Sequence, residues 1–299
     1  MLRKAIALIV LAGIAAPAVA QDRLAWKYRD GQVFYMQEVM EQKQVVTTGT
    51  NKEEKTSTQT TVTRFRVLKA ATDGSVEMEM KMLSVKEEGP AAEQNAPILS
   101  RMENSTFRVA LDPKGQIKKF EGYEDFVSRV ADGNAQMAKV FRSIMSEEVF
   151  QKMVTQTFSV VPNTSRKRGD TWQQKQGMTL GPFGRVLINR NIQHAGMAKS
   201  KSGRPYVKLA LTGKADYQPP TQNFEGLPFK IIDGDLDFDG ITGTGYFDTE
   251  LGRLHQLTVN LRMKGQLKIR LLQDQKEATV DLEQSQKGTV RITDKNPLL

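Results

Sequence analysis

Apolar and polar residues alternate with a period of two along most of this chain of 299 residues. Residues 76–82 place one valine and three methionines on one side and charged residues on the other, and residues 107–111, 207–211 and 236–239 repeat the alternation. Such a pattern is typical of strands that bury one face and expose the other, as in an antiparallel sheet. Turn sequences rich in Gly and Asp separate these segments, so we expect roughly ten to twelve strands.

The spacing changes to that of helices between residues 123 and 158. One apolar helical face, with spacing i, i+3, i+4 and i+7, is formed by Met137, Val140, Phe141 and Ile144. Ser146, followed by two glutamates, is typical of a helix N-cap, and Pro162 ends the region. We therefore predict two or three helices as an insert over residues 123–161.

The strands before and after this insert resemble each other. Segments 111–117 and 247–254 share the order strand, Asp, short turn, Gly and aliphatic strand. We therefore expect a single β-rich domain over residues 21–299, with similar halves at 21–122 and 163–299. Its fold class is α+β and β-dominated: a long curved antiparallel sheet, half-barrel or clam-like, with the helices packed on it. The Thr-rich stretch 47–63 predicts an exposed hairpin that turns near residues 51–54.

Residues 1–20 have the features of a secretory signal peptide. Arg3 and Lys4 precede an uncharged apolar run, and Ala18 and Ala20 form a small-residue cleavage site. The alternative is a transmembrane anchor, but the run has about 12 residues and a span needs about 20. We expect cleavage near Ala20 and a soluble protein, exported to the periplasm or the exterior, that does not span the membrane.

Composition excludes several chemistries. The chain contains no Cys and only two His, which excludes disulfides, thiol nucleophiles, iron–sulfur clusters and Cys-based zinc sites. The formal charge of +9 is scattered along the chain without interleaved aromatics, so no nucleic-acid partner is predicted. Weak contact with anionic envelope surfaces fits this mild excess. No cofactor is predicted.

Catalytic motifs are also missing from the sequence. Neither G-x-S-x-G nor S-x-x-K occurs, and these patterns mark the activated serine of several hydrolase classes. His194 and His255 lie on expected strands, where we expect a partly exposed or hydrogen-bonded imidazole. A pair of carboxylates brought together by the fold stays open as an alternative, because such pairs are invisible in sequence.

An Asp-rich segment offers one weak candidate calcium site. The candidate ligands are Asp235, Asp237 and Asp239. Followed by Gly240, they match the opening of a calcium loop, but its twelfth position is Tyr246 rather than Glu. The alternative is a strand in which Leu236 and Phe238 point inward and the carboxylates point to water.

Methionine is the remaining feature. The chain has 13 Met, and flexible thioethers suit apolar surfaces that accept varied ligands. The predicted ligand pocket, between sheet and helices, is formed by Met78, Met80, Met82, Met137, Val140, Phe141, Ile144, Phe150 and Met153. The alternative is an ordinary core in which Met fills gaps.

A family resemblance rests on several weak motifs in a fixed order. These are the signal peptide, the strand opening at 31–35, the turn at 112–117, the central helices, and Pro162 followed by residues 169–172. In this order the chain resembles an uncharacterised family of secreted bacterial proteins, a domain of unknown function. Its expected architecture is distantly similar to periplasmic lipoprotein carriers. The resemblance implies no activity and no catalytic residues.

These patterns together predict a non-enzymatic binding module of the cell envelope. Its ligand would be a lipid or another apolar molecule held between sheet and helices. One alternative is a structural or interaction protein that acts through its sheet edges and the Thr-rich hairpin. A carboxylate-dependent hydrolase is the second alternative.

Overall fold

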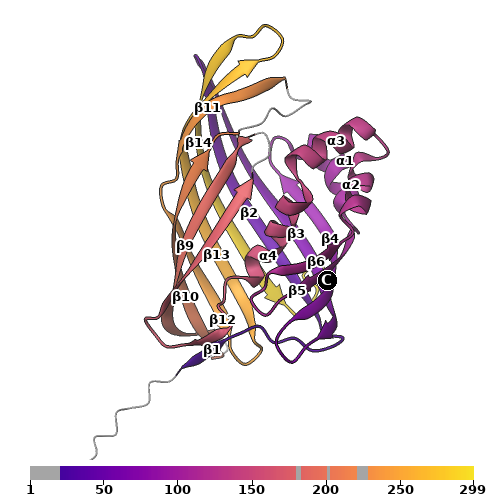
Figure 1. Cartoon of the computed structure of the whole chain (residues 1–299), viewed down its shortest axis with the longest axis vertical. Coiled ribbons are helices and arrows are strands. Elements are labelled where there is room, and N and C mark those ends of the chain that lie inside the picture. Colours follow the sequence, from indigo (N-terminus) through magenta and orange to yellow (C-terminus); the bar gives the residue numbers. More distant parts are fainter. Residues whose placement is uncertain (1–20, 180–182, 201–202, 221–227) are drawn as a thin grey trace, which may run out of the picture.

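Twelve strands form one antiparallel sheet that curves into an open half-barrel (Figure 1). The computed structural model describes residues 21–179, 183–200, 203–220 and 228–299. The N-terminal strands are β2 (Val33–Thr48), β3 (Asn51–Ala70), β4 (Val76–Glu88), β5 (Thr106–Leu111) and β6 (Ile117–Glu121). The C-terminal strands are β8 (Thr171–Thr179), β9 (Arg185–Lys199), β10 (Pro205–Gln218), β11 (Phe229–Asp237), β12 (Ile241–Asp248), β13 (Arg253–Leu271) and β14 (Glu277–Thr293). A separate pair is formed by β1 (Asp22–Leu24) and β7 (Thr164–Arg166).

The order of the strands joins the two ends of the chain in the middle of the sheet. Each half is an antiparallel meander, and β2 pairs with β14 along Tyr35–Thr48. The sheet therefore has its open edges at β6 and β8. The expected β-dominated α+β fold with a long antiparallel sheet is confirmed. Whether the two meanders arose by duplication stays a prediction.

Four helices accompany the sheet. They are α1 (Ala92–Met102), α2 (Tyr123–Ala131), α3 (Ala135–Ile144) and α4 (Glu147–Phe158). The last three match the predicted insert, and Ser146 caps α4 by accepting a hydrogen bond from the Val149 amide. The sequence did not predict α1, which contains Pro97 and buries none of its residues, so no strong apolar face marks it.

The core lies where the helices meet the N-terminal strands. Figure 1 shows α1, α2 and α3 gathered beside β3 and β4, while β9, β10 and β13 form the opposite wall. Phe107 of β5 lies 4.9 Å from Phe150 of α4 and 5.4 Å from Phe126 of α2, measured between ring centroids. Such aromatic contacts add to the burial of large apolar surfaces. The helices therefore cover one part of the curved sheet with a dense core.

Helix α4 occupies the gap between the open edges, because it contacts both β6 and β8. Both tryptophans of the chain fix the segment that follows it. Trp26 Nε1 donates to the Phe158 carbonyl at 2.8 Å, and Trp172 Nε1 donates to the Val160 carbonyl at 3.1 Å. These bonds satisfy carbonyl groups at and beyond the helix end, which otherwise lack partners.

Strands β11 and β12 form one long strand with an interruption. Both pair with β13, β11 along Lys264–Leu271 and β12 along Arg253–Asn260. The break at residues 238–240 falls on the Asp-rich segment, and Gly240 there adopts a positive φ of 71°, which glycine tolerates without steric cost. The Asp-rich segment is therefore a strand with a kink at its end.

The Thr-rich stretch forms the expected hairpin, but its turn lies elsewhere. Strands β2 and β3 are joined at Gly49 and Thr50, and Asn51 already pairs with Thr48. The prediction of a turn near residues 51–54 is therefore wrong. Gly49 adopts a positive φ, which favours a tight turn at residues 49–50.

The expected signal peptide and the expected lack of a membrane span can be compared with the structure only in part. The predicted signal peptide, residues 1–20, lies outside the described residues. Among the helices of the described ranges, none has both the length and the apolar character needed to cross a bilayer.

Candidate functional site

Two apolar clusters lie on the inner face of the C-terminal strands, beside the main core, which Val259 of the first cluster also contacts. The first contains Val186, Ile188, Ala215, Tyr217, Ile241, Val259, Leu261 and Phe238. The second contains Ile231, Leu236, Leu267, Phe229, Met263, Ile269 and Leu282, and shares Tyr217 and Phe238 with the first. We call the two clusters together the distal wall. All of its members come from β9 to β14 and the β11–β12 link, so the described helices contribute none.

The distal wall shares its face with the main core. Along β9, Val186 and Ile188 alternate with exposed residues in the same phase as Ile192, which belongs to the main core. Leu261, Met263 and Leu282 of the wall are only half-buried. The adjoining strands β2 and β3 present Gln42, Gln44, Ser57 and Gln59 on this face, together with Met40 and Val46. The concave side is therefore more polar on β2 and β3 than on the distal wall.

A polar row crosses the end of the distal wall at the sheet edge. The pairing register places Arg190 of β9 opposite Gln174 of β8 on one side and Gly213 of β10 on the other. Within the described residues, Arg190 Nε and the Oε1 atoms of Gln174 and Gln176 are buried without hydrogen-bond partners. Burial also lowers the pKa of the Arg190 guanidinium. Uncompensated polar groups of this kind are costly and rare in native proteins.

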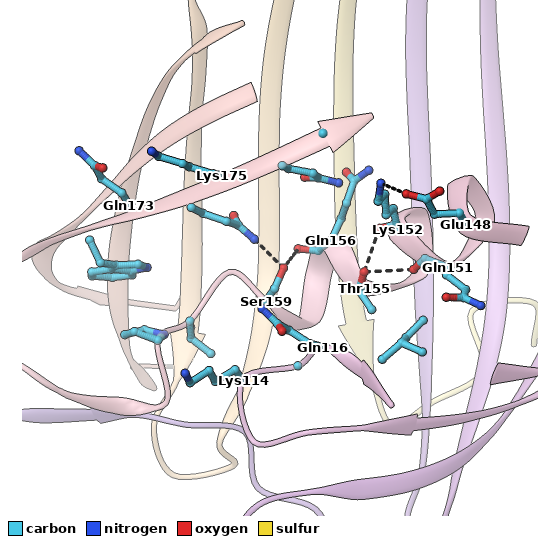
Figure 2. Close-up of a pocket in the computed structure, with 18 of the residues that line it drawn as sticks. Lys114, Gln116, Glu148, Gln151, Lys152, Thr155, Gln156, Ser159, Gln173 and Lys175 are labelled. Carbon is cyan, nitrogen blue, oxygen red and sulfur yellow. Dashed lines mark hydrogen bonds and ion pairs between the residues drawn. The ribbon is translucent and has the colours of Figure 1, made fainter. Parts of the chain in front are cut away.

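The same glutamines line a cleft of about 640 Å³ between α4, β8 and the turn before β6 (Figure 2). Its charged side chains are Lys114, Glu148, Lys152, Arg166 and Lys175. Glu148 forms an ion pair with Lys152 across one helical turn. The cleft therefore has three further cations and no further carboxylate among its lining residues.

A titratable group on β2 also faces the concave side. Glu38 is half-buried, and desolvation raises the pKa of its carboxyl group to about 7. Its cross-strand neighbours are Thr61 and Val290, neither of which is charged. Within the described ranges no ion pair includes Glu38. It is therefore a single carboxyl group without an adjacent acidic neighbour across the strands, whereas glycoside hydrolysis requires two carboxylates.

The nine predicted pocket residues divide between two environments. Met78, Met80, Met82 and Phe150 are buried in the main core, where they pack against other side chains. Met137, Ile144 and Met153 are 41 to 47 % exposed. Val140 and Phe141 are half-buried. The structure therefore does not bring the nine together around one cavity, because α3 presents much of its apolar face to solvent; their role as ligand contacts stays a prediction.

Neither histidine is arranged as a catalytic base. His194 is buried, its Nε2 lies 2.8 Å from Asp22 Oδ2, and its Nδ1 accepts a hydrogen bond from the Gly196 amide. With both ring nitrogens occupied, no position is left to accept a proton from a nucleophile. His255 stacks on Tyr206 with ring centroids 4.8 Å apart. His194 is therefore hydrogen-bonded, and His255 is half-buried in a ring stack.

The candidate calcium ligands point away from the concave side. Asp235, Asp237 and Asp239 are exposed, while Leu236 between them is buried. Asp235 and Asp237 border a groove of about 500 Å³ that also contains Lys264 and Asp281. Among the residues that the structure describes, no group of three or more His, Cys, Asp or Glu is arranged to hold a metal ion. The strand interpretation fits this placement.

Arg190 was not among the residues predicted from the sequence, although the pattern of β9 contains a signal for it. Residues 186, 188, 190 and 192 share one face, and three of the four are aliphatic. A charged residue at an inward position of such a strand is rare enough to mark a candidate site. Gln174 and Gln176 carry no such signal, because nothing in the sequence pairs β8 with β9 in this register.

Likenesses to solved structures are distant. One is lipovitellin, from a study of its lipid–protein interactions (12 % identity, TM-score 0.43, 90 % of this chain); the chain spans only 26 % of that chain. Another is DynF from the dynemicin biosynthesis pathway of Micromonospora chersina (10 %, TM-score 0.21, 95 % of this chain and 92 % of that one). A third is the COG4313 outer membrane channel from Pseudomonas putida F1 (9 %, TM-score 0.20, 90 % and 98 %). No functional conclusion follows from likenesses this distant.

Sequence comparison gives a match to a family over part of the chain and no activity. No curated protein matches the chain in sequence. The matched family segment runs from β3 to β9 and so includes all four helices and the cleft. The expected resemblance to an uncharacterised family is confirmed in this sense: residues 59–195 match the family of unknown function DUF6263.

Proposed function

We propose that the protein is a non-enzymatic binding module of the cell envelope that holds an apolar or amphipathic ligand on the distal wall. The observation that carries this proposal is that none of the described helices covers the wall, although its residues are as apolar as those of the main core. Part of the wall is only half-buried, and apolar surface left to water is unfavourable by roughly 25 cal/mol for each Å² exposed. A ligand that covers Leu261, Met263 and Leu282 would remove this surface from water.

The shape of the sheet favours an elongated ligand. The wall extends over neighbouring strands from β9 to β14 on the concave side of the half-barrel. Each methylene group of an alkyl chain contributes about 0.8 kcal/mol when it is fully buried. We therefore expect an acyl chain that lies along the distal wall. The sheet–helix interface is not the expected position, because core side chains fill it.

Export is part of the same proposal. The signal-like segment 1–20 supports it, since residues 5–16 are too short for a bilayer span. Expression in a bacterial host followed by intact-mass measurement tests it. We expect a chain that begins at Gln21; a mature chain that retains residues 1–20 would contradict export by this signal.

Native mass spectrometry tests ligand binding directly. The protein, purified without detergent, should carry an adduct of a few hundred daltons that organic solvent removes. Leu261→Gln, on the distal wall, should reduce the adduct. Leu187→Gln is the matched control, because Leu187 is also half-buried but lies on the outer face of β9. A bare mass for the wild type, both as purified and after incubation with fatty acids, would contradict the proposal.

A second candidate function is docking of a partner on the open edge of the sheet. Strand β8 is an edge strand, and its residues 173–177 line the cleft of Figure 2. An edge strand can pair with an extended segment of another chain. Size-exclusion chromatography with light scattering tests self-association by this route. A monomer at micromolar concentration would exclude pairing between copies.

A further inference from the structure

Arg190 lies on the inner face of the half-barrel, at the end of the distal wall. Ile188 and Ile192 flank it along β9, and Gly213, which has no side chain to pair with it, lies opposite on β10. Gly213 in turn lies opposite Ile241, which packs in one cluster with Leu261. The guanidinium group and the apolar wall therefore occupy neighbouring positions on one concave surface.

The described part of the chain supplies no counter-ion for Arg190. None of the ion pairs there includes it, and its Nε is buried without an acceptor. Removing an unpaired charge from water costs several kcal/mol in a protein interior. A group that stays charged under these conditions is compensated when an external anion reaches it.

The neighbours of Arg190 fit an oxygen-rich group. Gln174 lies opposite Arg190 on β8, and its Nε2 donates to Ser159 Oγ of α4, which fixes the amide. The Oε1 atoms of Gln174 and Gln176 have no donor within the described residues, so they can accept from a hydroxyl group of the ligand but not from its anion. A planar guanidinium binds a carboxylate or phosphate through parallel hydrogen bonds, and the amide N–H groups of glutamine can donate to the same oxygens.

We propose that Arg190, with Gln174 and Gln176, binds the anionic head group of an amphipathic ligand, a carboxylate or a phosphate, while the alkyl chain lies on the distal wall. This inference rests on the proposed function and adds the class of ligand to it. Gln174 and Gln176 also line the cleft of Figure 2 together with Lys114, Lys175 and Arg166, none of which belongs to an ion pair within the described residues. Such a positive cleft attracts an anion before it binds.

The test compares three probes with the same alkyl chain on the purified protein. Oleic acid carries a carboxylate, oleyl phosphate carries a phosphate, and oleyl alcohol is neutral. The wild type should bind at least one anionic probe about 10- to 100-fold more tightly than the alcohol, the range expected for a desolvated charge pair. The anion that binds more tightly distinguishes a carboxylate from a phosphate as the head group.

Arg190→Met should remove this preference and leave the affinity for oleyl alcohol within about twofold. Arg262→Gln is the matched control, because Arg262 is exposed on the outer face of β13, and it should leave all three affinities unchanged. Without ligand, Arg190→Met should also unfold at a higher temperature than the wild type, since the uncompensated charge is gone. Arg190→Lys, which keeps the charge but not the planar fork, should retain part of the preference.

The outcomes separate this inference from the proposed function. Equal binding of all three probes by the wild type would overturn the head-group site but leave the distal wall as a binding surface. A loss of alcohol binding in Arg190→Met equal to the loss of anion binding would also overturn the head-group site. No binding of any probe would overturn the proposed function and this inference together.

Discussion

Two regions of the same sheet carry similar apolar patterns but differ in what covers them. Met78, Met80 and Met82 of β4 face the core and are at most 6 % exposed, because helices and aromatic rings pack near them. Leu261 and Met263 of β13 alternate with polar residues in the same way, yet no described helix joins their cluster. The first region is covered by helices of the chain itself, whereas no described helix covers the second, which is where we propose that a ligand binds.

The largest expected effect separates the two regions by stability. Phe107→Ala removes a ring packed between α2, α4 and β6, and should lower the free energy of unfolding by about 4 kcal/mol. Leu261→Ala should cost about 1 kcal/mol without ligand, because its side chain is only half-buried. Urea denaturation of both variants measures the difference. Equal losses would mean that the distal wall is packed as densely as the core.

A pH-dependent effect is expected at Glu38. Its folded pKa of about 7 exceeds the ordinary value of 4.5, so the folded protein favours the protonated form. The resulting penalty is absent below about pH 4.5, grows as the pH rises, and is complete above pH 7. Because the carboxyl group is half-buried, Glu38→Gln should stabilise the protein by about 2 kcal/mol at pH 8 and by almost nothing at pH 4.

Thermal unfolding of the wild type and Glu38→Gln across this pH range measures the effect. The matched control is Glu41→Gln, on the same strand, whose carboxylate is exposed and pairs with Lys287. It should show no gain in stability at pH 8. A Glu38→Gln gain that does not depend on pH would contradict the raised pKa.

A smaller effect is expected at the start of α4, the helix that closes the gap between the sheet edges. Ser146→Ala removes the hydrogen bond from the Val149 amide to the serine hydroxyl and should cost about 1 kcal/mol. Ser146→Asp, which also caps a helix, should restore most of the stability. Failure of Asp to rescue would show that Ser146 acts otherwise than as a cap.

The smallest effect is expected on α3. Met137 is 41 % exposed, so Met137→Gln should change stability by less than about 0.5 kcal/mol. The same substitution at Met78, which is fully buried, should unfold much of the protein by leaving an amide in the core. If Met137→Gln abolished adduct formation in native mass spectrometry, the predicted sheet–helix pocket would replace the distal wall as the binding site.

Local signals predicted many of the elements correctly. The alternation at residues 76–82 became β4, the helical spacing from Tyr123 became α2 to α4, and Ser146 is a cap. The signals failed where the local pattern is weak: α1 contains Pro97 and buries no residue, and β11 and β12 are separated only by residues 238–240. An isolated glycine or proline in the sequence does not show whether a strand ends there or continues after a kink.

The candidate site was harder to predict than the elements. The methionine content predicted a ligand pocket at Met78, Met80 and Met82, but these side chains are packed in the main core. The sequence shows Arg190 as a charged residue among the aliphatic residues of one strand face. Its proposed role as a binding residue depends on Gln174 from β8 and Gly213 from β10, which lie opposite it. Those neighbours come from pairings between strands, and pairing register is set by the whole sheet rather than by one segment.

The sequence by itself determined that this protein is built from half-buried strands with a helical insert, and that it has no thiol. Only the tertiary structure decided which apolar faces are covered. The pairing of β2 with β14 joins the ends of the chain and leaves β6 and β8 as edges, with α4 between them. The physical reason is that alternation of apolar and polar residues along a strand shows which face of the strand is apolar. Which other elements pack on that face depends on long-range strand pairing and on the curvature of the sheet.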